Sequence, residues 1–509
     1  MTRQSQSTDP SLILFPNQLY AINYLPKPSN ISTVYLVEDP IFFGVREKIY
    51  HFNQVKLLYH RASMCYYYDY LQQNKYHVIY ITCSDILENA YDNLPLDQPC
   101  SMFTFYDHLL HRRLRAYMKK QSYIWESIEW MESPNFIVTE TDLHAYHSKQ
   151  NDEKKQFQHQ PFYQYVKEII GLLENEPSHD SENRKSLPSS IKIPPLPDVK
   201  EGAKYVTEAK KYIQTNFPNH PGSVEHLQFP ITHDESIQWV DSFLTERFHS
   251  FGDYQDSISK KHPFLFHSTI SPMLNIGLLQ PCEVVSRVKR YYQTHKNEIG
   301  MNDYEGFIRQ LIGWREYQRY VYMYAYDDII SKNYFNHTNG LTSHWYDGST
   351  GIQPVDDCIH TGFKYGYLHH INRLMVMSNI MNLCRISPHE CYRWFMEFAI
   401  DSYDWVMIQN VYSMGQWSDG GLTMRKPYLS SNNYIANMGD YGKADKSWGG
   451  IWRGLYYCFL VDHKKQLSST PYLRNLSHWN KMTTEERNQL RQKAKSFITS
   501  RTKTNIISS

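Results

Sequence analysis

The fold of the larger part of this chain is decided by residues 365–438. The segment opens with YGYLHHINRLMVMSN (365–379), continues through RWFMEFAIDSYDWV (393–406) and ends with SDGGLTMRKPYLSSNNYIANM (418–438). Apolar and aromatic residues recur there at helical spacing, and glycine, proline and asparagine separate the runs. The helical pattern extends from about residue 226 onward, so we expect a large all-helical domain over 226–509.

Charged and polar side chains interrupt this pattern in a way that is typical of a site for a large, buried cofactor. His369 and His370 are adjacent and lie one helical turn before Arg373, and Asp401 follows the next run. Adjacent residues on a helix point about 100° apart. A buried histidine more often satisfies only its own hydrogen bonds; the alternative here is a proton donor that titrates near neutral pH.

Residues 11–145 show a different pattern, in which strand and helix signals alternate. Short apolar runs rich in β-branched residues predict strands at LILF (12–15), STVYLVED (32–39) and YHVIYITC (76–83). Helical spacing between the last two runs predicts a right-handed, parallel α/β sheet, and we expect this domain over 1–145. Ligands of such sheets bind at the carboxyl ends of the strands, but no GxGxxG motif supports a dinucleotide.

The stretch between the two expected domains, 146–225, is rich in charge, serine and proline. One short amphipathic run, FYQYVKEIIGLLE (162–174), predicts a helix within it. The composition is typical of an interdomain connector that runs over the surface.

Composition excludes several classes of protein. With a net charge of +1 over 509 residues, the chain as a whole is not a strongly basic nucleic-acid binder. Its eight cysteines form no CxxC pair and no zinc or iron–sulfur spacing, which is typical of reduced thiols in an intracellular protein. We find no secretory signal in MTRQSQSTDP and no run of about 18 apolar residues. We therefore expect a soluble, intracellular monomer without membrane association.

Three further motifs each allow two interpretations. In HSTISPMLNIGLL (267–279), the hydroxyl groups could bind phosphate or merely cap a helix. Arg315 and Arg319 lie four residues apart, as on a solvated helix face, and the alternative is contact with a DNA backbone. Tyr428 and Tyr434 follow two glycines and either line a pocket for an extruded base or lie on the surface.

Eight runs in chain order carry a resemblance to a known family. They are LILFPNQL, KLLYHRASM, DSENRKSLP, EGFIRQLIGWREY, YLHHINRLMV, RWFMEFAIDSYDWV, DGGLTMRKPY and NNYIANM. Together they span nearly the whole chain and resemble the photolyase–cryptochrome family. The greatest similarity is to its bacterial branch with an iron–sulfur cluster, the deoxyribodipyrimidine photolyase-related proteins, some of which repair (6-4) photoproducts.

The resemblance implies an antenna-type α/β domain, a long connector and a helical domain that holds FAD. The implied activity is that of a deoxyribodipyrimidine photolyase, a carbon–carbon lyase that uses blue light and reduced FAD to split pyrimidine dimers in UV-damaged DNA. The histidine pair favours the (6-4) photoproduct as substrate. The alternatives are a cryptochrome-like flavin photoreceptor without repair and a cyclobutane-dimer photolyase. The α/β domain implies an antenna chromophore, whose identity the sequence leaves open.

The resemblance also implies which residues contact the cofactor. Four residues match the segment that holds the FAD phosphates: His267, Ser268, Thr269 and Ser271. Three residues match positions that contact the flavin or its ribityl chain: Gln310, Arg373 and Asp401.

Lesion binding and electron transfer are implied in the same way. His369 and His370 match a histidine pair at the lesion pocket, and His370 is the expected proton donor. Tyr428 and Tyr434 match tyrosines near the lesion. Trp394 matches a tryptophan of the path that photoreduces the flavin, and Tyr346 takes the place of an earlier tryptophan of that path.

Three departures from the family pattern bear on the chemistry. Leu374 stands where animal-type (6-4) enzymes have a further histidine, although the bacterial branch also lacks it. Phe395 replaces a tyrosine that follows the path tryptophan, so photoreduction is expected to be slower or rerouted. Met407 stands near the expected flavin N5, where relatives carry a polar or acidic side chain.

The largest departure concerns the metal. By alignment, the four cluster cysteines are replaced by residues that offer no thiolate: Pro354, Gly442, Asp445 and Gly450. Cys358 and Cys458 are out of register with these positions. We therefore predict no iron–sulfur cluster, and we hypothesise that Trp448 and Trp452 brace the region by packing.

Overall fold

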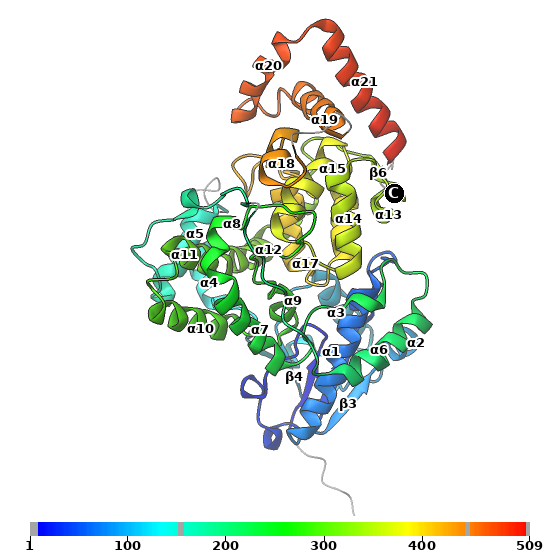
Figure 1. The fold of residues 1–509 in the computed structure, drawn as a ribbon. Helices are drawn as coiled ribbons and strands as arrows, with labels where there is room; N and C mark the ends of the chain where they lie inside the picture. The colour runs from blue at the N-terminus through cyan, green and yellow to red at the C-terminus, as the bar shows by residue number, and fades with distance from the viewer. Residues whose placement is uncertain (1–8, 151–156, 189, 443–447, 505–509) are drawn as a thin grey trace, which may run out of the picture. The chain divides into compact units, whose positions relative to one another are not determined.

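A computed structural model describes residues 9–150, 157–188, 190–442 and 448–504. The chain begins with strands and helices at its blue, N-terminal end and continues as helices toward its red, C-terminal end (Figure 1). It divides into two compact units. Their limits are Met1–Ala145, Leu196–Thr245 and Thr269–Thr294 for the first unit, and Tyr146–Pro195, Glu246–Ser268 and His295–Ser509 for the second. The expected three-part division shares the limit at 145 with the first unit and otherwise stays a prediction.

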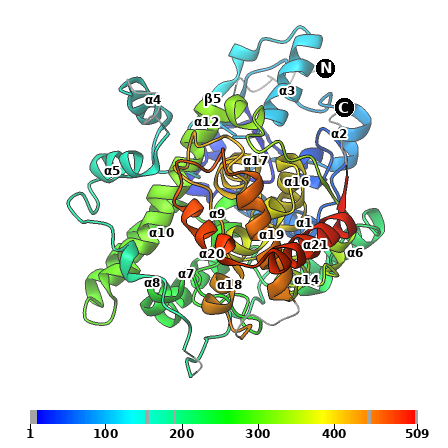
Figure 2. The ribbon, with the colours of Figure 1, turned by 90° about the horizontal axis from the view of Figure 1, so that it is seen from above.

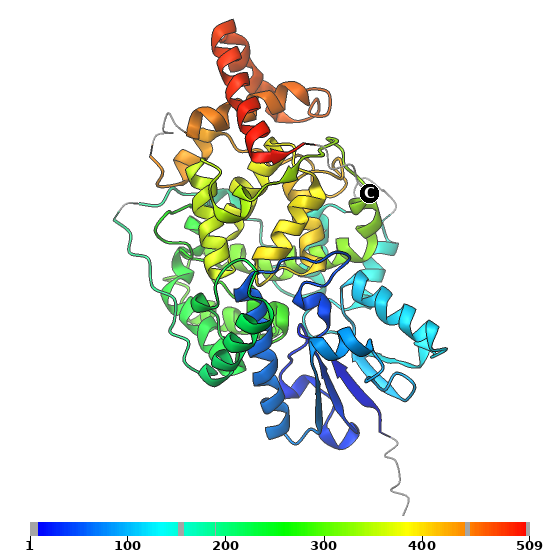
Figure 3. The same cartoon turned by 90° about the vertical axis from the view of Figure 1, so that its right-hand side faces the viewer.

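The first unit contains a five-stranded parallel sheet in the order β3-β2-β1-β4-β5 (Figure 3). Its strands are β1 (Ser11–Leu14), β2 (Val34–Val37), β3 (Val78–Ile81), β4 (Cys100–Phe103) and β5 (Glu129–Met131). Leu12 pairs with Val34 of β2 and Ser101 of β4, which fixes the register of the central strand. The strand order places the crossover between β1 and β4, where sheets of this kind bind ligands.

Helices complete the first unit. They are α1 (Gln54–Gln73), α2 (Cys83–Asn89), α3 (His108–Lys120), α4 (Glu140–Ser148, which ends in the second unit), α6 (Ala203–Asn216), α7 (His233–Glu246), α9 (Ser271–Ile276) and α10 (Pro281–Thr294). Helix α6 comes from the expected connector and packs against α1, where Arg61 Nη2 lies 2.8 Å from Glu208 Oε1. That part of the connector is therefore a helix of the α/β unit.

The second unit is helical. Its α-helices are α5 (His159–Ile170), α8 (Phe251–Tyr254), α11 (Met301–Ile308), α12 (Glu316–Ile330), α13 (His344–Asp347), α14 (Gln353–Tyr365), α15 (Asn379–Leu383), α16 (Pro388–Phe398), α17 (Asp404–Met407), α18 (Asn432–Met438), α19 (Trp448–Asp462), α20 (Leu476–Lys481) and α21 (Thr484–Arg501). The expected pairing of an α/β region with a large helical region is confirmed. None of the helices in the described ranges has both the length and the apolar run needed to cross a bilayer.

Three π-helical segments interrupt the helices of the second unit. They are η8 (Arg309–Arg315), η9 (Asn372–Ser378) and η10 (Ile408–Gly415). π-Helical turns are rare and occur frequently at functional sites. Two of them carry residues that the sequence assigns to a cofactor site, Gln310 in η8 and Arg373 in η9.

The last helices form a group of their own, in which α19 and α21 pack side by side next to α20 (Figures 1 and 2). A capping box starts α21, because Thr483 N–H donates to Glu486 Oε2 at 2.7 Å and Glu486 N–H donates to Thr483 Oγ1 at 3.2 Å. After α21, the short strand β7 (Thr502–Lys503) pairs with β6 (Gly340–Leu341). The end of α21 is therefore tied to the rest of the unit.

The expectation that Arg315 and Arg319 form a solvated face is wrong. Arg315 is 8% exposed and Arg319 is fully buried. The guanidinium of Arg315 lies over the ring of Trp405 at 4.9 Å from its centroid, and Arg319 lies 4.0 Å from Glu316. Both side chains are therefore buried against other residues, which does not favour the alternative of contact with a DNA backbone.

Candidate functional site

The pair formed by Arg373 and Asp401 lies at the centre of the candidate site. Arg373 Nη1 and Nη2 donate to Asp401 Oδ1 and Oδ2 at 2.9 and 3.0 Å, and Nε donates to the Leu368 carbonyl at 2.6 Å. The guanidinium also lies over the rings of Tyr367 and Phe398, at 5.2 and 5.5 Å. Two parallel hydrogen bonds fix the orientation of both side chains, as in other arginine–carboxylate pairs.

Beside Arg373, His369 is stacked on His267. The two rings are nearly parallel, at 11°, with centroids 4.6 Å apart. His369 is 1% exposed, and neither of its ring nitrogens has a hydrogen-bond partner among the described residues. The Nε2 atom of His267 also has no hydrogen-bond partner among the described residues. Burial lowers the pKa of both imidazoles, that of His267 to about 3, so both are neutral at pH 7.

His370 differs from its neighbour because solvent reaches its side chain. The helix begins at His370, so His369 lies just before it, and the expectation that both histidines lie on a helix is wrong for His369. Although it is accessible, His370 is surrounded by enough protein that desolvation, aided by the charge of Arg373, lowers its pKa to about 4.

Buried polar atoms without partners mark this region as a place for a polar ligand. Besides the histidine nitrogens, Asn372 Oδ1 has no hydrogen-bond partner among the described residues. Leaving one such group unsatisfied costs about 1–3 kcal/mol, so a cluster of them is unusual unless a bound molecule supplies the missing bonds. The donors and acceptors present fit a flat heteroaromatic group with both kinds of polar atom, such as an isoalloxazine ring.

The predicted phosphate-binding segment is divided between the two units, with His267 and Ser268 in the second and Thr269 and Ser271 in the first. Thr269 Oγ1 accepts a hydrogen bond from Trp239 Nε1 at 3.0 Å. The φ angle of Thr269 is +55°, an uncommon conformation for a β-branched residue. Helix α9 begins at Ser271. Phosphate binding by this segment stays a prediction.

Gln310 lies in η8 and is half-buried. Its Nε2 donates to the Gly306 carbonyl at 2.9 Å, within its own helix. Its neighbour Arg309 lies 2.8 Å from Asp180, which connects η8 to the DSENRKSLP run. Contact between Gln310 and a flavin stays a prediction.

A charged pair that sequence reasoning missed acts electrostatically on both Tyr428 and Tyr434. Arg184 Nε lies 3.5 Å from Asp256 Oδ2, and the charges of both residues act on both tyrosines, whose pKa values are raised chiefly by burial. Arg184 belongs to the DSENRKSLP run, which was quoted for its resemblance but otherwise attributed to the connector. Because that run contains many charged residues, its sequence did not indicate that the charge of Arg184 in particular would act on two tyrosines.

The loop with Tyr428 is fastened to the helix that follows the histidine pair. Ser430 Oγ donates to the Met375 carbonyl at 2.7 Å, and Ser430 N–H donates to Asn379 Oδ1 at 3.0 Å. Ser430 in turn accepts a hydrogen bond from Trp452 Nε1 at 3.0 Å on its carbonyl. The tyrosine group and the histidine group are therefore held on one connected framework.

Trp394 is buried in α16 and belongs to a row of aromatic rings. Its centroid lies 4.6 Å from that of Phe398 and 6.0 Å from that of Phe363. Phe363 lies 5.9 Å from Tyr346, which is only half-buried. The row leads from the ring beneath Arg373 to the surface.

The four aligned cluster positions hold no thiolate where the structure describes them. Pro354 lies in α14 and Gly450 in α19, while Gly442 precedes α19 and Asp445 lies outside the described residues. Among the described residues, no three His, Cys, Asp or Glu side chains are grouped closely enough to bind a metal ion. The absence of a cluster stays a prediction.

The hypothesis that two tryptophans pack in this region agrees with the structure. Trp448 and Trp452 are 2% and 0% exposed, and their ring centroids are 6.0 Å apart. Tyr441 packs against Trp448 at 6.3 Å. Trp452 is also the residue that donates to Ser430, so the packing reaches the tyrosine loop.

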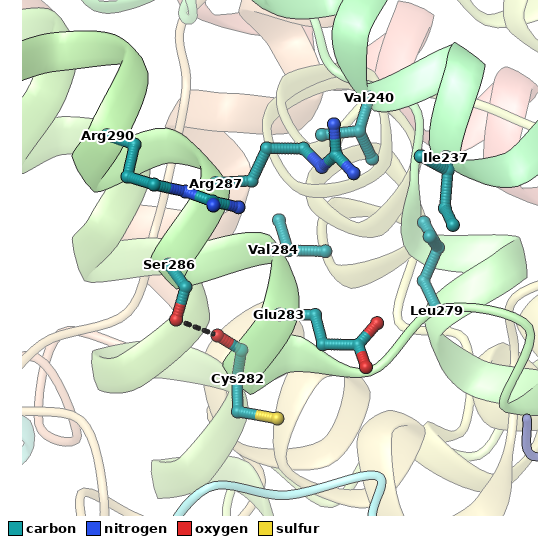
Figure 4. Close-up of a pocket in the computed structure, with 9 residues that line it drawn as sticks. All are labelled: Ile237, Val240, Leu279, Cys282, Glu283, Val284, Ser286, Arg287 and Arg290. Carbon is teal, nitrogen blue, oxygen red and sulfur yellow. Dashed lines mark hydrogen bonds between the residues drawn. The ribbon is translucent and has the colours of Figure 1, made fainter. Parts of the chain in front are cut away.

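A hollow of about 270 Å³ lies elsewhere, between α7 and α10 of the first unit (Figure 4). It is lined by apolar side chains such as Val240 and Val284 and by Arg287, which is paired with Asp241 at 2.8 Å. None of the predicted site residues lines it. The unpartnered polar atoms of His267, His369 and Asn372 lie beside the Arg373–Asp401 pair in the second unit, so we place the candidate site there.

Comparisons with known proteins agree with this placement. Residues 12–229 match the model of the deoxyribodipyrimidine photo-lyase-related protein family, and residues 305–444 match the FAD binding domain of DNA photolyase. A "(6-4) photolyase" of Agrobacterium fabrum is 33% identical over 353 residues, which are 66% of this chain and 69% of that protein. The chain is a member of the photolyase–cryptochrome family. The FAD-binding match includes the predicted residues from Gln310 to Tyr434, whereas 267–271 lie outside both matched ranges.

Solved structures of photolyases and cryptochromes share the fold. A class III photolyase from Agrobacterium tumefaciens matches with a TM-score of 0.55 at 15% identity and covers 98% of each chain. A cryptochrome from Synechocystis matches with a TM-score of 0.55 at 14% identity, covering 95% of this chain and 94% of that one. The photolyase–cryptochrome fold is therefore shared with members of both functional kinds.

Proposed function

We propose that this protein is a light-driven DNA repair enzyme that uses reduced FAD to split pyrimidine dimers, with the (6-4) photoproduct as favoured substrate. The observation that carries the proposal is the solvent-accessible His370 beside the Arg373–Asp401 pair, within the range that matches the photolyase FAD-binding domain. The similarity to a (6-4) photolyase supports the choice of lesion.

FAD, when bound, supplies a light-absorbing electron donor. The Arg373–Asp401 pair and Gln310 would contact its flavin or ribityl chain, and the segment from His267 to Ser271 would bind its phosphates. The unpartnered nitrogens of His267 and His369 support this assignment, because a bound flavin offers the donors and acceptors that these groups lack. We also propose an antenna chromophore in the first unit, near the carboxyl ends of its strands, without identifying it.

His370 would act on the lesion by moving a proton. A pyrimidine that has gained an electron becomes more basic, and a nearby imidazolium donates a proton to it from a ring nitrogen. In the ligand-free protein the pKa of His370 is about 4. The phosphates of bound DNA would raise that pKa by favouring the charged imidazole, so substrate binding itself would prepare the proton donor.

The remaining side chains would receive the damaged base. Tyr428 and Tyr434 are each half-buried and lie near the exposed Arg184. Phenol rings stack on an extruded base, and an exposed arginine offers a contact for a backbone phosphate. The resulting partner is UV-damaged duplex DNA with the lesion flipped out of the helix.

Defined lesions test the proposal. The purified protein should show flavin absorption, and blue light should repair a duplex that carries a single (6-4) photoproduct. Repair of a cyclobutane dimer instead would assign the alternative substrate. Bound flavin that responds to light without repair of either lesion would contradict the proposed enzyme and assign the cryptochrome-like role.

A further inference from the structure

The row of aromatic rings ends at Tyr346, which is hydrogen-bonded to the carboxylate of Glu397. Tyr346 OH donates to Glu397 Oε2 at 2.7 Å. Glu397 is 2% exposed, whereas Tyr346 is half-buried at the end of the row formed by Phe398, Trp394 and Phe363. The contact therefore joins the last ring of a possible electron path to a base that bulk water does not reach.

A tyrosine at this place has a chemical requirement that a tryptophan does not have. A tryptophan radical cation persists long enough to pass on an electron while it keeps its N–H proton. An oxidised phenol is a strong acid, so tyrosine loses its electron readily only when a base takes the O–H proton in the same event. The nearest base to the proton of Tyr346 is the carboxylate to which it is already bonded.

We propose that Glu397 accepts the phenol proton of Tyr346 whenever that tyrosine is oxidised. One electron moves from Tyr346 to an oxidised Trp394, which regains its neutral state, and one proton moves from Tyr346 Oη to Glu397 Oε2. The products are a neutral tyrosyl radical and a protonated Glu397. The oxidant of Trp394 is photoexcited FAD in its oxidised form, which takes up one electron, and a soluble thiol later returns one electron to Tyr346 while Glu397 returns the proton.

The surroundings of Glu397 suit a base that is charged before the reaction. Arg393 Nε lies 3.9 Å from Glu397 Oε1, and this cation favours the carboxylate form. Burial and the neighbouring carboxylate raise the pKa of Tyr346, so the phenol keeps its proton at rest. Before oxidation the proton is thus on the tyrosine, and the contact with Arg393 favours an unprotonated Glu397.

The same helix offers a matched control. Glu390 lies two turns before Glu397 in α16, is 8% exposed and pairs with Arg393 Nη2 at 2.9 Å. Glu390 pairs with the same arginine, whereas the phenol of Tyr346 donates to Glu397. Replacing Glu390 by Gln changes the charge near Arg393 without removing the proposed acceptor.

The test uses two oxidants, so that one of its two arms does not depend on excitation of the flavin. The first is the bound flavin under blue light, whose use in this arm rests on the proposed function. The second is a soluble ruthenium photosensitiser with an external quencher, which oxidises aromatic side chains in the same protein without flavin excitation. In each arm, the signal of Tyr346 is the tyrosyl radical absorption that disappears in Tyr346→Phe.

With either oxidant, wild-type protein should form the Tyr346 radical more slowly in D₂O than in H₂O. An infrared difference spectrum should show a new protonated carboxyl band. Glu397→Gln should remove that band and slow radical formation by about 100-fold, as expected for loss of a positioned base. Glu390→Gln should change neither the carboxyl band nor the rate of radical formation. In Tyr346→Trp, whose indole needs no base, Glu397→Gln should have no effect on the rate of oxidation.

The proposal is overturned if, in the ruthenium arm, the Tyr346 radical forms at the wild-type rate in Glu397→Gln, or if no carboxyl band appears. A glutamate-dependent radical in the ruthenium arm, together with no oxidation of Tyr346 under blue light, supports Glu397 as acceptor and contradicts photoreduction through this row. The two arms therefore distinguish failure of Glu397 as proton acceptor from failure of the proposed flavin function.

Discussion

Arg373 and Asp401 are joined by two parallel hydrogen bonds of 2.9 and 3.0 Å, which connect η9 to the turn that follows α16. The side chains of the pair are only 14% and 7% exposed, so each depends on the other for compensation of its charge. The pair therefore fixes the two segments between which the histidines and the aromatic row are held.

Asp401→Asn should lower the free energy of unfolding by about 3 kcal/mol, because it leaves a largely buried guanidinium without its counter-charge. Urea unfolding at pH 7 measures the change. Asp241→Asn is the control, since it breaks the more exposed pair with Arg287, whose hydrogen bonds of 2.8 and 3.0 Å are of similar length, and it should cost less than about 1 kcal/mol. Equal losses in the two variants would contradict the structural role of Arg373–Asp401.

Acid should destabilise the protein between pH 6.5 and about 4. Burial lowers the pKa of His159 and His267 to about 3, so the unfolded chain binds protons in this range that the folded chain does not. Stability is therefore complete above pH 6.5 and falls as pH decreases, by about 1.4 kcal/mol per pH unit for each such histidine. His159→Gln, outside the predicted site, should reduce the slope between pH 6 and 5 by one proton, as measured by denaturant unfolding. An unchanged slope would contradict the buried, neutral state of His159.

Trp452→Phe should lower the free energy of unfolding by about 1 kcal/mol, because the fully buried indole N–H no longer donates to the Ser430 carbonyl, which keeps only the 3.4 Å hydrogen bond from Asn379 Nδ2. The same change should loosen the loop that carries Tyr428, since Ser430 is the residue that ties this loop to Met375. Faster amide exchange of residues 428–431, measured by mass spectrometry, checks the second effect. Loss of stability with unchanged exchange there would show that Trp452 does not brace the loop.

Iron and acid-labile sulfide should be absent from protein purified without oxygen. The aligned positions Pro354, Gly442 and Gly450 carry no side chain that binds iron, and neither Asp445 alone nor the two displaced cysteines replace four thiolates. About four iron atoms per chain would contradict this prediction. Cys358→Ser and Cys458→Ser would then test whether these cysteines, rather than the aligned positions, act as ligands.

Much of the fold follows from local pattern. The first three strands are predicted by β-branched apolar runs, and the capping box at Thr483 marks the start of the last helix. Strands β4 (CSMF) and β5 (EWM) were missed, because neither contains a β-branched residue and both are short. Their place in the sheet depends on the pairing of β4 with β1 and of β5 with β4, which local sequence does not encode.

The candidate site was predictable only in part. The ion pair of Arg373 with Asp401 and the burial of Trp394 agree with positions chosen from the sequence. The π-helical segments were not foreseen, because they differ from an α-helix by single hydrogen-bond shifts that leave the apolar pattern almost unchanged. The burial of Arg319 was also not foreseen. A charged residue at helical spacing normally lies on a solvent-exposed face, whereas Arg319 is fully buried.

The measurement that tests the central claim most directly is blue-light repair of a duplex with one (6-4) photoproduct, by wild-type protein and by His370→Ala. Wild-type protein should repair the lesion and His370→Ala should not, with equal flavin absorption in both. His478→Ala, which changes an exposed histidine in α20, should repair as the wild type does. Repair at the wild-type rate by His370→Ala would contradict the assignment of His370 as proton donor, and absence of repair in the wild type would contradict the proposed enzyme.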